Sequence, residues 1–289
     1  MKQILLALAL TSLAAIPASA ADKIPVVAAE NFYGDVASAV GGDHVAVTAI
    51  LANPDEDPHL FEASPSVARN LAAAQLVVYN GADYDPWMAK LLSANNAPGR
   101  AVIVAADLVH KKPGDNPHLW YNPPTMPAVA AAIATELTSL DPADKADFDA
   151  NLAKLDASLT LVTDKAASIK AKYAGTAATA TEPVFGYMAA ALGLKMRNES
   201  FQLAVMNDTE PSARDTAAME SDLKSARVKV FFYNSQVTDP LTTRLLAIAN
   251  AAHVPVVGVS ETEPAGKTFS QWMLDQLDAT EKALAGPSS

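Results

Sequence analysis

The sequence has no cysteine among its 289 residues. This absence excludes disulfide bonds, cysteine nucleophiles, iron–sulfur clusters and zinc sites built on thiolates. We also expect no bacterial lipid anchor, because such an anchor is attached to an N-terminal cysteine. Any metal ion that this chain binds must therefore be held by histidine, aspartate and glutamate side chains.

Basic residues are also scarce. The chain carries 21 Lys and Arg against 32 Asp and Glu, for a formal net charge of −11, and no basic cluster interrupts this pattern. Because nucleic-acid binders neutralise phosphates with Lys and Arg, we expect no nucleic-acid partner. Hydrophobic residues make up 50% and charged residues 18%, which is typical of a globular protein with a sizeable core.

The N-terminus has the pattern of a signal peptide. Lys2 supplies a positive charge, an apolar stretch begins at Ile4–Leu10, and Ala18-Ser19-Ala20 is a small-x-small cleavage signal. The apolar run is interrupted by polar residues and a proline before it is long enough for a comfortable membrane span, so a short membrane anchor is the weaker interpretation. We therefore expect residues 1–20 to be removed and the mature protein to be exported to the periplasm, without a lipid anchor.

The remaining sequence predicts an α/β protein. Short β-branched runs alternate with Ala- and Leu-rich stretches, which favours βαβ units and mainly parallel sheets flanked by helices. The expected strands are Ile24–Ala28, Val45–Leu51, Leu76–Asn80 and Ala101–Ala105 in the first half, and Ala178–Thr181, Phe201–Val205, Val228–Tyr233 and Val254–Val259 in the second.

Between the halves lies one long amphipathic helix. Pro142 and Gly175 are its start and stop signals. A coiled-coil arm is the competing explanation, but the stripe is short and both flanks are α/β. We therefore expect an N-terminal lobe at 21–140, a linking helix at 141–174 and a C-terminal lobe at 175–289. The apolar stripe has spacings of three and four and consists of Phe148, Leu152, Leu155, Leu159, Val162, Ala166, Ile169 and Tyr173.

Two histidines stand out as candidate metal ligands. His59 follows Asp55-Glu56-Asp57-Pro58, and His118 follows Asn116-Pro117, so each lies in a Pro-His step on a loop after an expected strand. Open α/β sheets bind their ligands at such loops, and imidazole is a common ligand of late divalent metals. A packed or surface histidine is the alternative for either one. His44, His110 and His253 fit ordinary surface positions, and His110 could at best be an accessory capture group.

The second half offers carboxylates at the corresponding places. Glu182 follows one expected strand and precedes a helical run, so its carboxylate could face the cleft or simply favour the helix N-terminus. Glu261 and Glu263 follow the last expected strand, and one of them could point inward. The sequence has no Gly-x-Ser-x-Gly, Walker or His-Glu-x-x-His motif and no dinucleotide-binding fingerprint, so we expect no enzyme.

Several short motifs occur together along the mature chain. In combination they resemble the solute-binding proteins of metal-importing ABC transporters, in the long-helix class that delivers zinc or manganese. The motifs are Ala29-Glu30-Asn31-Phe32-Tyr33-Gly34-Asp35, Asp57-Pro58-His59, Glu62-Ala63-Ser64-Pro65-Ser66, Tyr79-Asn80-Gly81, Asn116-Pro117-His118-Leu119-Trp120, Phe185-Gly186-Tyr187 and Gln271-Trp272-Met273.

The resemblance implies four ligands, two from each lobe. On the matching positions these are His59, His118, Glu182 and Glu261, with Glu263 open as the fourth. Zinc members commonly have a histidine at the third position and often a His-rich capture loop. This chain has Glu182 and no such loop, which favours Mn²⁺ modestly over Zn²⁺ because carboxylates are harder ligands. The implied partner is an ABC permease in the inner membrane, and we expect a monomer.

Two other functions fit the same scaffold less well. A binding protein for an organic or siderophore-like ligand would need a wide, aromatic-lined cleft, whereas aromatic residues make up only 6% of this chain. A metal hydrolase would need an open coordination position, with Glu263 or Asp57 as general base. An additional role as an adhesin is not decided by the sequence.

Overall fold

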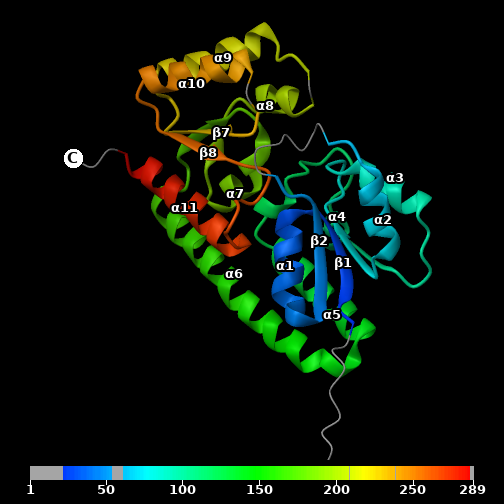
Figure 1. Cartoon of the computed structure of the whole chain (residues 1–289). Coiled ribbons are helices and arrows are strands. Elements are labelled where there is room, and N and C mark those ends of the chain that lie inside the picture. Colours follow the sequence, from blue (N-terminus) through cyan, green and yellow to red (C-terminus); the bar gives the residue numbers. More distant parts are fainter. Residues whose placement is uncertain (1–21, 54–60, 208, 238, 287–289) are drawn as a thin grey trace, which may run out of the picture.

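The computed structural model describes residues 22–53, 61–207, 209–237 and 239–286. The expected signal peptide and His59 lie outside these residues. The described chain forms two α/β lobes, with one long helix, α6 (Lys145–Tyr173), running along both of them (Figure 1). This arrangement confirms the expected fold class.

Each lobe contains a four-stranded sheet in which every pairing is parallel. The two sheets have equivalent strand orders, β2-β1-β3-β4 and β6-β5-β7-β8. The strands are β1 (Ile24–Glu30), β2 (Val45–Leu51), β3 (Leu76–Tyr79), β4 (Ala101–Val104), β5 (Ala177–Ala180), β6 (Lys195–Met196), β7 (Val230–Asn234) and β8 (Val256–Val259).

Helices cover the faces of these sheets, as parallel strands require. In the first lobe they are α1 (Asn31–Gly41), α2 (Pro65–Ala73), α3 (Pro86–Ala94), α4 (Ala105–Leu108) and α5 (Thr125–Leu140). In the second they are α7 (Gly186–Ala191), α8 (Glu199–Met206), α9 (Ala213–Lys224), α10 (Pro240–Ala251) and α11 (Phe269–Ala285). Short 3-10 helices cover Gly42–His44, Leu119–Tyr121, Pro142–Asp144 and Pro183–Phe185.

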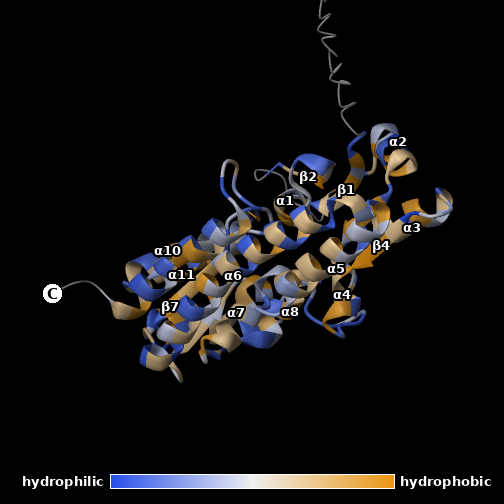
Figure 2. Cartoon of the chain, turned by 90° about the horizontal axis from the view of Figure 1, so that it is seen from below, coloured by the Kyte–Doolittle hydropathy of each residue, from blue (hydrophilic) through white to orange (hydrophobic). Residues whose placement is uncertain are grey.

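The expected apolar stripe of α6 faces the rest of the molecule. Phe148, Leu155, Leu159, Val162, Ala166 and Ile169 are buried, whereas Leu152 and Tyr173 are partly buried. Both hydrophobic and hydrophilic residues occur along this helix (Figure 2), and the buried side is formed by the apolar stripe, as in an amphipathic helix. The helix packs against α1 and α5 of the first lobe and against α7 and α11 of the second, so it is a brace shared by both lobes.

Aromatic side chains fill the junction between the lobes. Trp120 of the first lobe and Trp272 of the second both pack against Phe32, at ring-centroid distances of 4.8 and 6.0 Å. Tyr121 then contacts Trp272 at 5.7 Å and Phe185 at 5.2 Å. These rings belong to one apolar core that extends through both lobes. Relative motion of the lobes therefore has to disturb a packed core, which limits its amplitude.

One expected strand is wrong. Phe201–Val205 lies within helix α8, and the strand that pairs with β5 is instead the two-residue β6. A short apolar run can be a strand or one face of a helix, and periodicity does not separate the two. The other expected strands are present, with ends that differ by at most two residues.

None of the helices in the described part of the chain is long and apolar enough to cross a bilayer.

Candidate metal centre

The carboxyl ends of the strands carry the polar residues of the site. In the first sheet, Glu30 ends β1 and Asn80 follows β3, while in the second Asn234 ends β7 and Glu261 follows β8. Glu182 follows β5, directly before a 3-10 helix. In the first sheet the strand order reverses between β1 and β3, because the chain continues from β1 to one edge and from β3 to the other. The same reversal occurs between β5 and β7 in the second sheet. Open α/β sheets bind their ligands at such reversals.

His118 and Glu261 meet where the lobes join. Both side chains have an exposed fraction of 0%, and Nε2 of His118 lies 3.7 Å from Oε2 of Glu261. His118 lies in the segment that follows α4, directly before the 3-10 helix Leu119–Tyr121, and its ring packs edge-on against Trp120. An imidazole nitrogen from one lobe therefore faces a carboxylate oxygen from the other inside the protein.

Asn116 determines which nitrogen of His118 faces the carboxylate. The amide nitrogen of Asn116 donates to the carbonyl of Pro183 at 2.8 Å, so its Oδ1 is the atom that faces His118. Nδ1 of His118 lies 2.6 Å from this Oδ1, which is an acceptor only. Nδ1 therefore carries the proton, and in the neutral ring Nε2 has its lone pair directed toward Glu261. This is the tautomer that a metal ligand needs.

Asn234 holds the two carboxylates of the second lobe together. Its Nδ2 donates to Oε1 of Glu261 at 2.6 Å and to Oε1 of Glu182 at 3.3 Å. All three side chains are buried. Asn234 is a neutral amide and adds no charge, and two ionised carboxylates held this close inside a protein are stabilised by a nearby positive charge. A divalent cation is the partner that such an arrangement suits.

The structure distinguishes Glu261 from Glu263. Burial, followed by the charge of Asp35, raises the pKa of Glu263 to about 8. Its backbone is held by Asn31, which donates to the Glu263 carbonyl at 2.7 Å and accepts from its N–H at 3.0 Å. Of these two glutamates, only Glu261 has a described contact with His118.

A second buried acidic group lies behind the site. Glu30 is fully buried, and burial followed by the charge of Asp85 raises its pKa. Burial also raises the pKa of Asp85 to about 6, although this carboxylate accepts the backbone N–H groups of Asn80 and Gly81. The nearby Tyr84 has a raised pKa because of burial and of charges that include Glu261 and Glu30. With a pKa of about 6, Asp85 is mostly ionised at neutral pH, and its charge favours the protonated forms of Glu30 and Tyr84.

The sequence-predicted ligands are thus partly brought together. His118, Glu182 and Glu261 lie at the junction of the lobes, whereas His59 is outside the described residues. Within the part of the chain that is described, the group of acids and histidines whose ligand atoms all lie within 4.8 Å of one another is a different one, formed by His44, Asp144 and Asp147.

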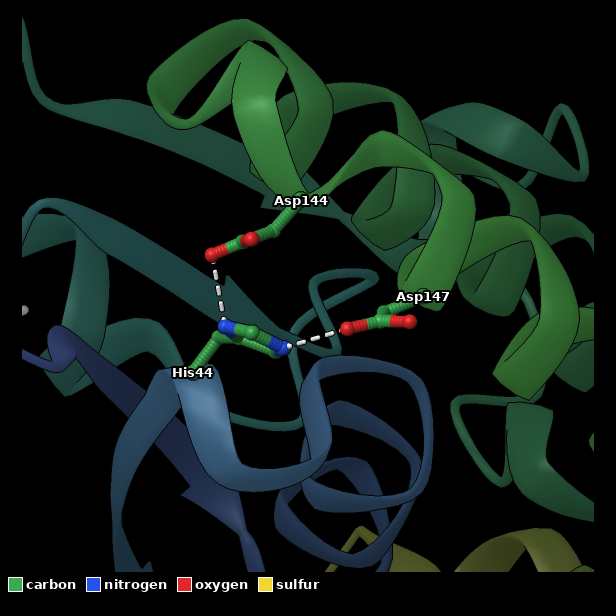
Figure 3. A group of neighbouring side chains, drawn as sticks. All are labelled: His44, Asp144 and Asp147. Atoms are coloured by element: carbon green, nitrogen blue, oxygen red, sulfur yellow. Dashed lines mark hydrogen bonds and ion pairs between the residues drawn. The ribbon is translucent and has the colours of Figure 1, made fainter. Parts of the chain in front are cut away.

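The His44 group has the geometry of an ion pair. Nδ1 of His44 lies 2.6 Å from the carboxylate of Asp144, and Nε2 lies 3.0 Å from the carboxylate of Asp147 (Figure 3). Each ring nitrogen is therefore in contact with one carboxylate. One metal ion cannot bind both nitrogens of a single ring. His44 was expected to be exposed, but its side chain is 27% exposed because it packs against the start of α6. His110 and His253 lie in turns with positive φ.

Sequence reasoning missed the amide residues of the site. Asn116 belongs to the Asn-Pro-His step, but no role was predicted for it, and neither Asn234 nor Asn31 was considered by itself. The available signal for Asn234 was a polar residue that ends an apolar strand, Val230–Asn234. An asparagine after a strand is common in turns, so this signal alone is weak.

Comparison with known proteins gives one family. Residues 26–283 match the family described as "Zinc-uptake complex component A periplasmic". A similar curated protein is the manganese ABC transporter substrate-binding lipoprotein PsaA of Streptococcus pneumoniae, with 24% identity over 91% of this chain and 90% of the relative. The metal ABC transporter substrate-binding lipoprotein SsaB of Streptococcus sanguinis is also 24% identical, over 92% of this chain and 91% of the relative.

Solved structures share the fold. The periplasmic zinc-binding protein TroA from Treponema pallidum superposes with a TM-score of 0.73 at 20% identity, covering 91% of this chain and 99% of that one. A crystal structure of ZnuA gives a TM-score of 0.72 at 22% identity, covering 92% and 100%.

Proposed function

Because this chain belongs to the family of periplasmic zinc-uptake complex components, we propose that it captures a divalent transition-metal ion and delivers it to an ABC import permease. The observation that carries this proposal is the buried pair of His118 and Glu261, whose ligand atoms face each other across the lobes at 3.7 Å. The curated relatives are substrate-binding proteins of metal ABC transporters, which supports the same role outside the cytoplasm.

The proposed ligands are His59, His118, Glu182 and Glu261. Two neutral imidazoles and two carboxylates balance the charge of a divalent ion. Because protons compete for both ligand types, affinity should fall as the pH is lowered. In this proposal Glu263 is not a ligand, since the described contact with His118 is made by Glu261.

The cargo is proposed to be Zn²⁺ or Mn²⁺, with a modest preference for Mn²⁺ from the two carboxylates. The names of relatives support both ions, since PsaA is named for manganese and TroA for zinc. Zn²⁺ binds most nitrogen and oxygen sites more tightly than Mn²⁺, so any preference has to come from the geometry of the site.

We further propose that the mature protein is a monomer in the periplasm, released by cleavage after Ala20. The streptococcal relatives are named lipoproteins, whereas the sequence of this chain has no cysteine to carry a lipid. We propose no catalytic activity, because the four protein ligands would fill the coordination sphere of the metal ion.

The organic-ligand alternative is less well supported. Such a ligand would need aromatic side chains that line a cleft, but Trp120, Tyr121 and Trp272 are buried and pack against one another or against Phe32. These residues hold the lobes together instead.

The test is the thermal midpoint of the metal-free exported protein with and without Mn²⁺ or Zn²⁺. A ligand that binds only the folded state adds about 2.7 kcal/mol at a hundredfold excess over its Kd. We expect an increase of several degrees with at least one ion, and the larger increase identifies the preferred cargo.

The matched variants are His118→Ala and His253→Ala. The first should abolish most of the metal-dependent increase, and the second should retain it because His253 lies in a turn after α10. An unchanged midpoint with both ions in the wild type would reject the metal-delivery proposal.

A further inference from the structure

The loop that carries Glu261 is attached to the opposite lobe. This loop, residues 260–268, connects β8 to α11 and belongs by sequence to the second lobe. The backbone of this loop and of Phe269, the first residue of α11, nevertheless bonds to side chains of the first lobe at three places. Tyr121 donates its hydroxyl to the Ser260 carbonyl at 3.0 Å, Asn31 pairs with Glu263, and Asp35 accepts the N–H of Phe269 at 2.9 Å.

The Asn31 contact differs from the other two, each of which is a single hydrogen bond. The Asn31 side chain makes two hydrogen bonds with a single residue, to the carbonyl at 2.7 Å and from the N–H at 3.0 Å. This paired geometry fixes both the position and the orientation of the Glu263 backbone, because an amide side chain supplies one donor and one acceptor in a plane. Glu263 lies two residues after Glu261.

The second lobe supports the same loop from the other side. Oε1 of Gln236 accepts the N–H groups of Glu261 at 2.5 Å and of Thr262 at 3.2 Å. The Glu261 backbone is therefore held by its own lobe, and the next turn of the loop is held by the first lobe. The carboxylate direction depends on both attachments, and so it depends on how the lobes sit relative to each other.

We propose that Asn31 is a positioning residue that sets Glu261 against His118 across the junction of the lobes. This inference rests on the proposed function, because it concerns the same metal site. Asn31 does not contact the metal. Its loss should leave the fold intact, with Tyr121 and Asp35 still holding Ser260 and Phe269, but release Glu263 from the first lobe, so that Glu261 is less firmly fixed at the distance that His118 requires.

The main variant is Asn31→Ala, and its matched control is Asn151→Ala. Asn151 is also a half-buried asparagine that makes a long-range bond, donating to the carbonyl of Val40 at 3.2 Å. This bond joins α6 to the far end of α1, where Val40 follows Asn31 by nine residues, a rise of about 14 Å along the helix. A second variant, Asn31→Asp, keeps the acceptor for the Glu263 N–H and removes the donor to its carbonyl.

The measurements are the Kd for Mn²⁺ and Zn²⁺, the rate of metal release, and the visible absorption spectrum of bound Co²⁺, which reports ligand geometry. We expect Asn31→Ala to weaken binding about tenfold, in the range of other residues that orient metal ligands, to speed release and to alter the Co²⁺ spectrum. Asn31→Asp should lie between Asn31→Ala and the wild type. Asn151→Ala should lower the thermal midpoint only.

A purely structural role gives a different result. If Asn31→Ala lowers the midpoint as Asn151→Ala does, with the Kd within twofold of wild type and an unchanged Co²⁺ spectrum, the inference is wrong while the proposed function stands. If the wild type itself binds neither ion, the proposed function fails first and this inference fails with it.

Discussion

At the level of single residues, three neutral amide side chains hold the proposed ligands or the loop that carries one of them. Asn116 orients His118, Asn234 joins the two carboxylates, and Asn31 holds the loop beyond Glu261. Amides suit these positions because they donate and accept without adding charge to a buried site. Each of them is buried or half-buried and bonded to residues far away in the sequence.

Asn116 orients His118 but is not itself a proposed ligand. Its removal should therefore lower the affinity for metal while leaving the proposed ligands in place. In Asn116→Ala the His118 ring loses the acceptor for Nδ1 and is free to adopt the other tautomer. Metal affinity should fall about 10- to 100-fold, as is typical when a partner of a metal-binding histidine is removed. Isothermal titration calorimetry with Mn²⁺ and Zn²⁺ measures this change.

The control for this prediction is Asn122→Ala. Asn122 lies on the same segment but donates to the Thr125 hydroxyl at 3.1 Å and not to His118. Equal losses of affinity in the two variants would show that the segment as a whole, rather than the Asn116 contact, is responsible.

The raised pKa of Glu263 predicts that the stability of the protein depends on pH. Its pKa is raised from 4.5 to about 8 by burial and by Asp35, so the folded protein retains this proton between those pH values while the unfolded chain releases it. The contribution of Glu263 to the free energy of unfolding is therefore fully present below pH 4.5 and is lost as the pH rises toward 8. Wild type should therefore lose stability relative to Glu263→Gln between pH 5 and pH 8, measured by urea unfolding of the metal-free protein.

Glu281→Gln is the contrasting variant for this measurement. Lys165 and Lys172 lower the pKa of Glu281 to about 2, so its contribution is present above pH 4.5 and disappears only as the pH falls through 2. The difference between wild type and Glu281→Gln should stay constant from pH 5 to pH 8. A constant difference for Glu263→Gln as well would contradict the assignment of a retained proton.

At the level of elements, contacts of His44 with Asp144 and Asp147 hold the start of α6 against the first lobe, and we call these three residues the clamp. His44, in the 3-10 helix before β2, lies between Asp144 and Asp147 at the beginning of the long helix (Figure 3). The clamp joins the first lobe to the helix that also braces the second. Its position at the N-terminal end of α6 also places the two carboxylates where the helix dipole favours them.

We predict that His44→Ala weakens this attachment and leaves cargo binding unchanged. The loss of a partly exposed ion pair and its hydrogen bonds should cost about 1 kcal/mol of stability. Urea unfolding measures the cost, and calorimetry measures the number of metal ions bound. A decrease in that number would mean that His44, Asp144 and Asp147 bind a metal ion and that the clamp interpretation is wrong.

At the level of the whole molecule, one apolar core connects the lobes through α6. Leu159 in the middle of this helix belongs to the same buried cluster as Phe32 of the first lobe and Phe232 of the second. Closure of the lobes around a metal ion therefore has to occur within a packed structure. Such a scaffold favours small movements of side chains and loops over a wide hinge opening.

The shared core predicts that both lobes unfold together. Differential scanning calorimetry of the metal-free protein should show one transition, and Leu159→Ala should lower its midpoint because removing a buried leucine costs about 2–5 kcal/mol. Two transitions, with only one of them moved by Leu159→Ala, would show that the lobes are energetically independent.

The sequence by itself determined the features that depend on local patterns. Short β-branched and apolar runs identified most strands, and apolar spacings of three and four identified the long helix, because both patterns extend over only a few neighbouring residues. The positions of His118, Glu182 and Glu261 after strands were also visible, since parallel sheets bring the ends of their strands to one edge. The apolar run Phe201–Val205 was misassigned because five residues are too few to separate a strand from a helix.

Only the tertiary structure gives neighbouring candidates different surroundings. Glu261 and Glu263 are two residues apart and chemically identical, yet Glu261 lies beside His118, whereas the charge of Asp35 raises the pKa of Glu263. The contacts that direct them come from Asn31, 232 residues away in the sequence, and from Asn234 on another strand. Hydrogen bonds between such distant residues leave no local pattern, because their geometry exists only after the lobes have packed together.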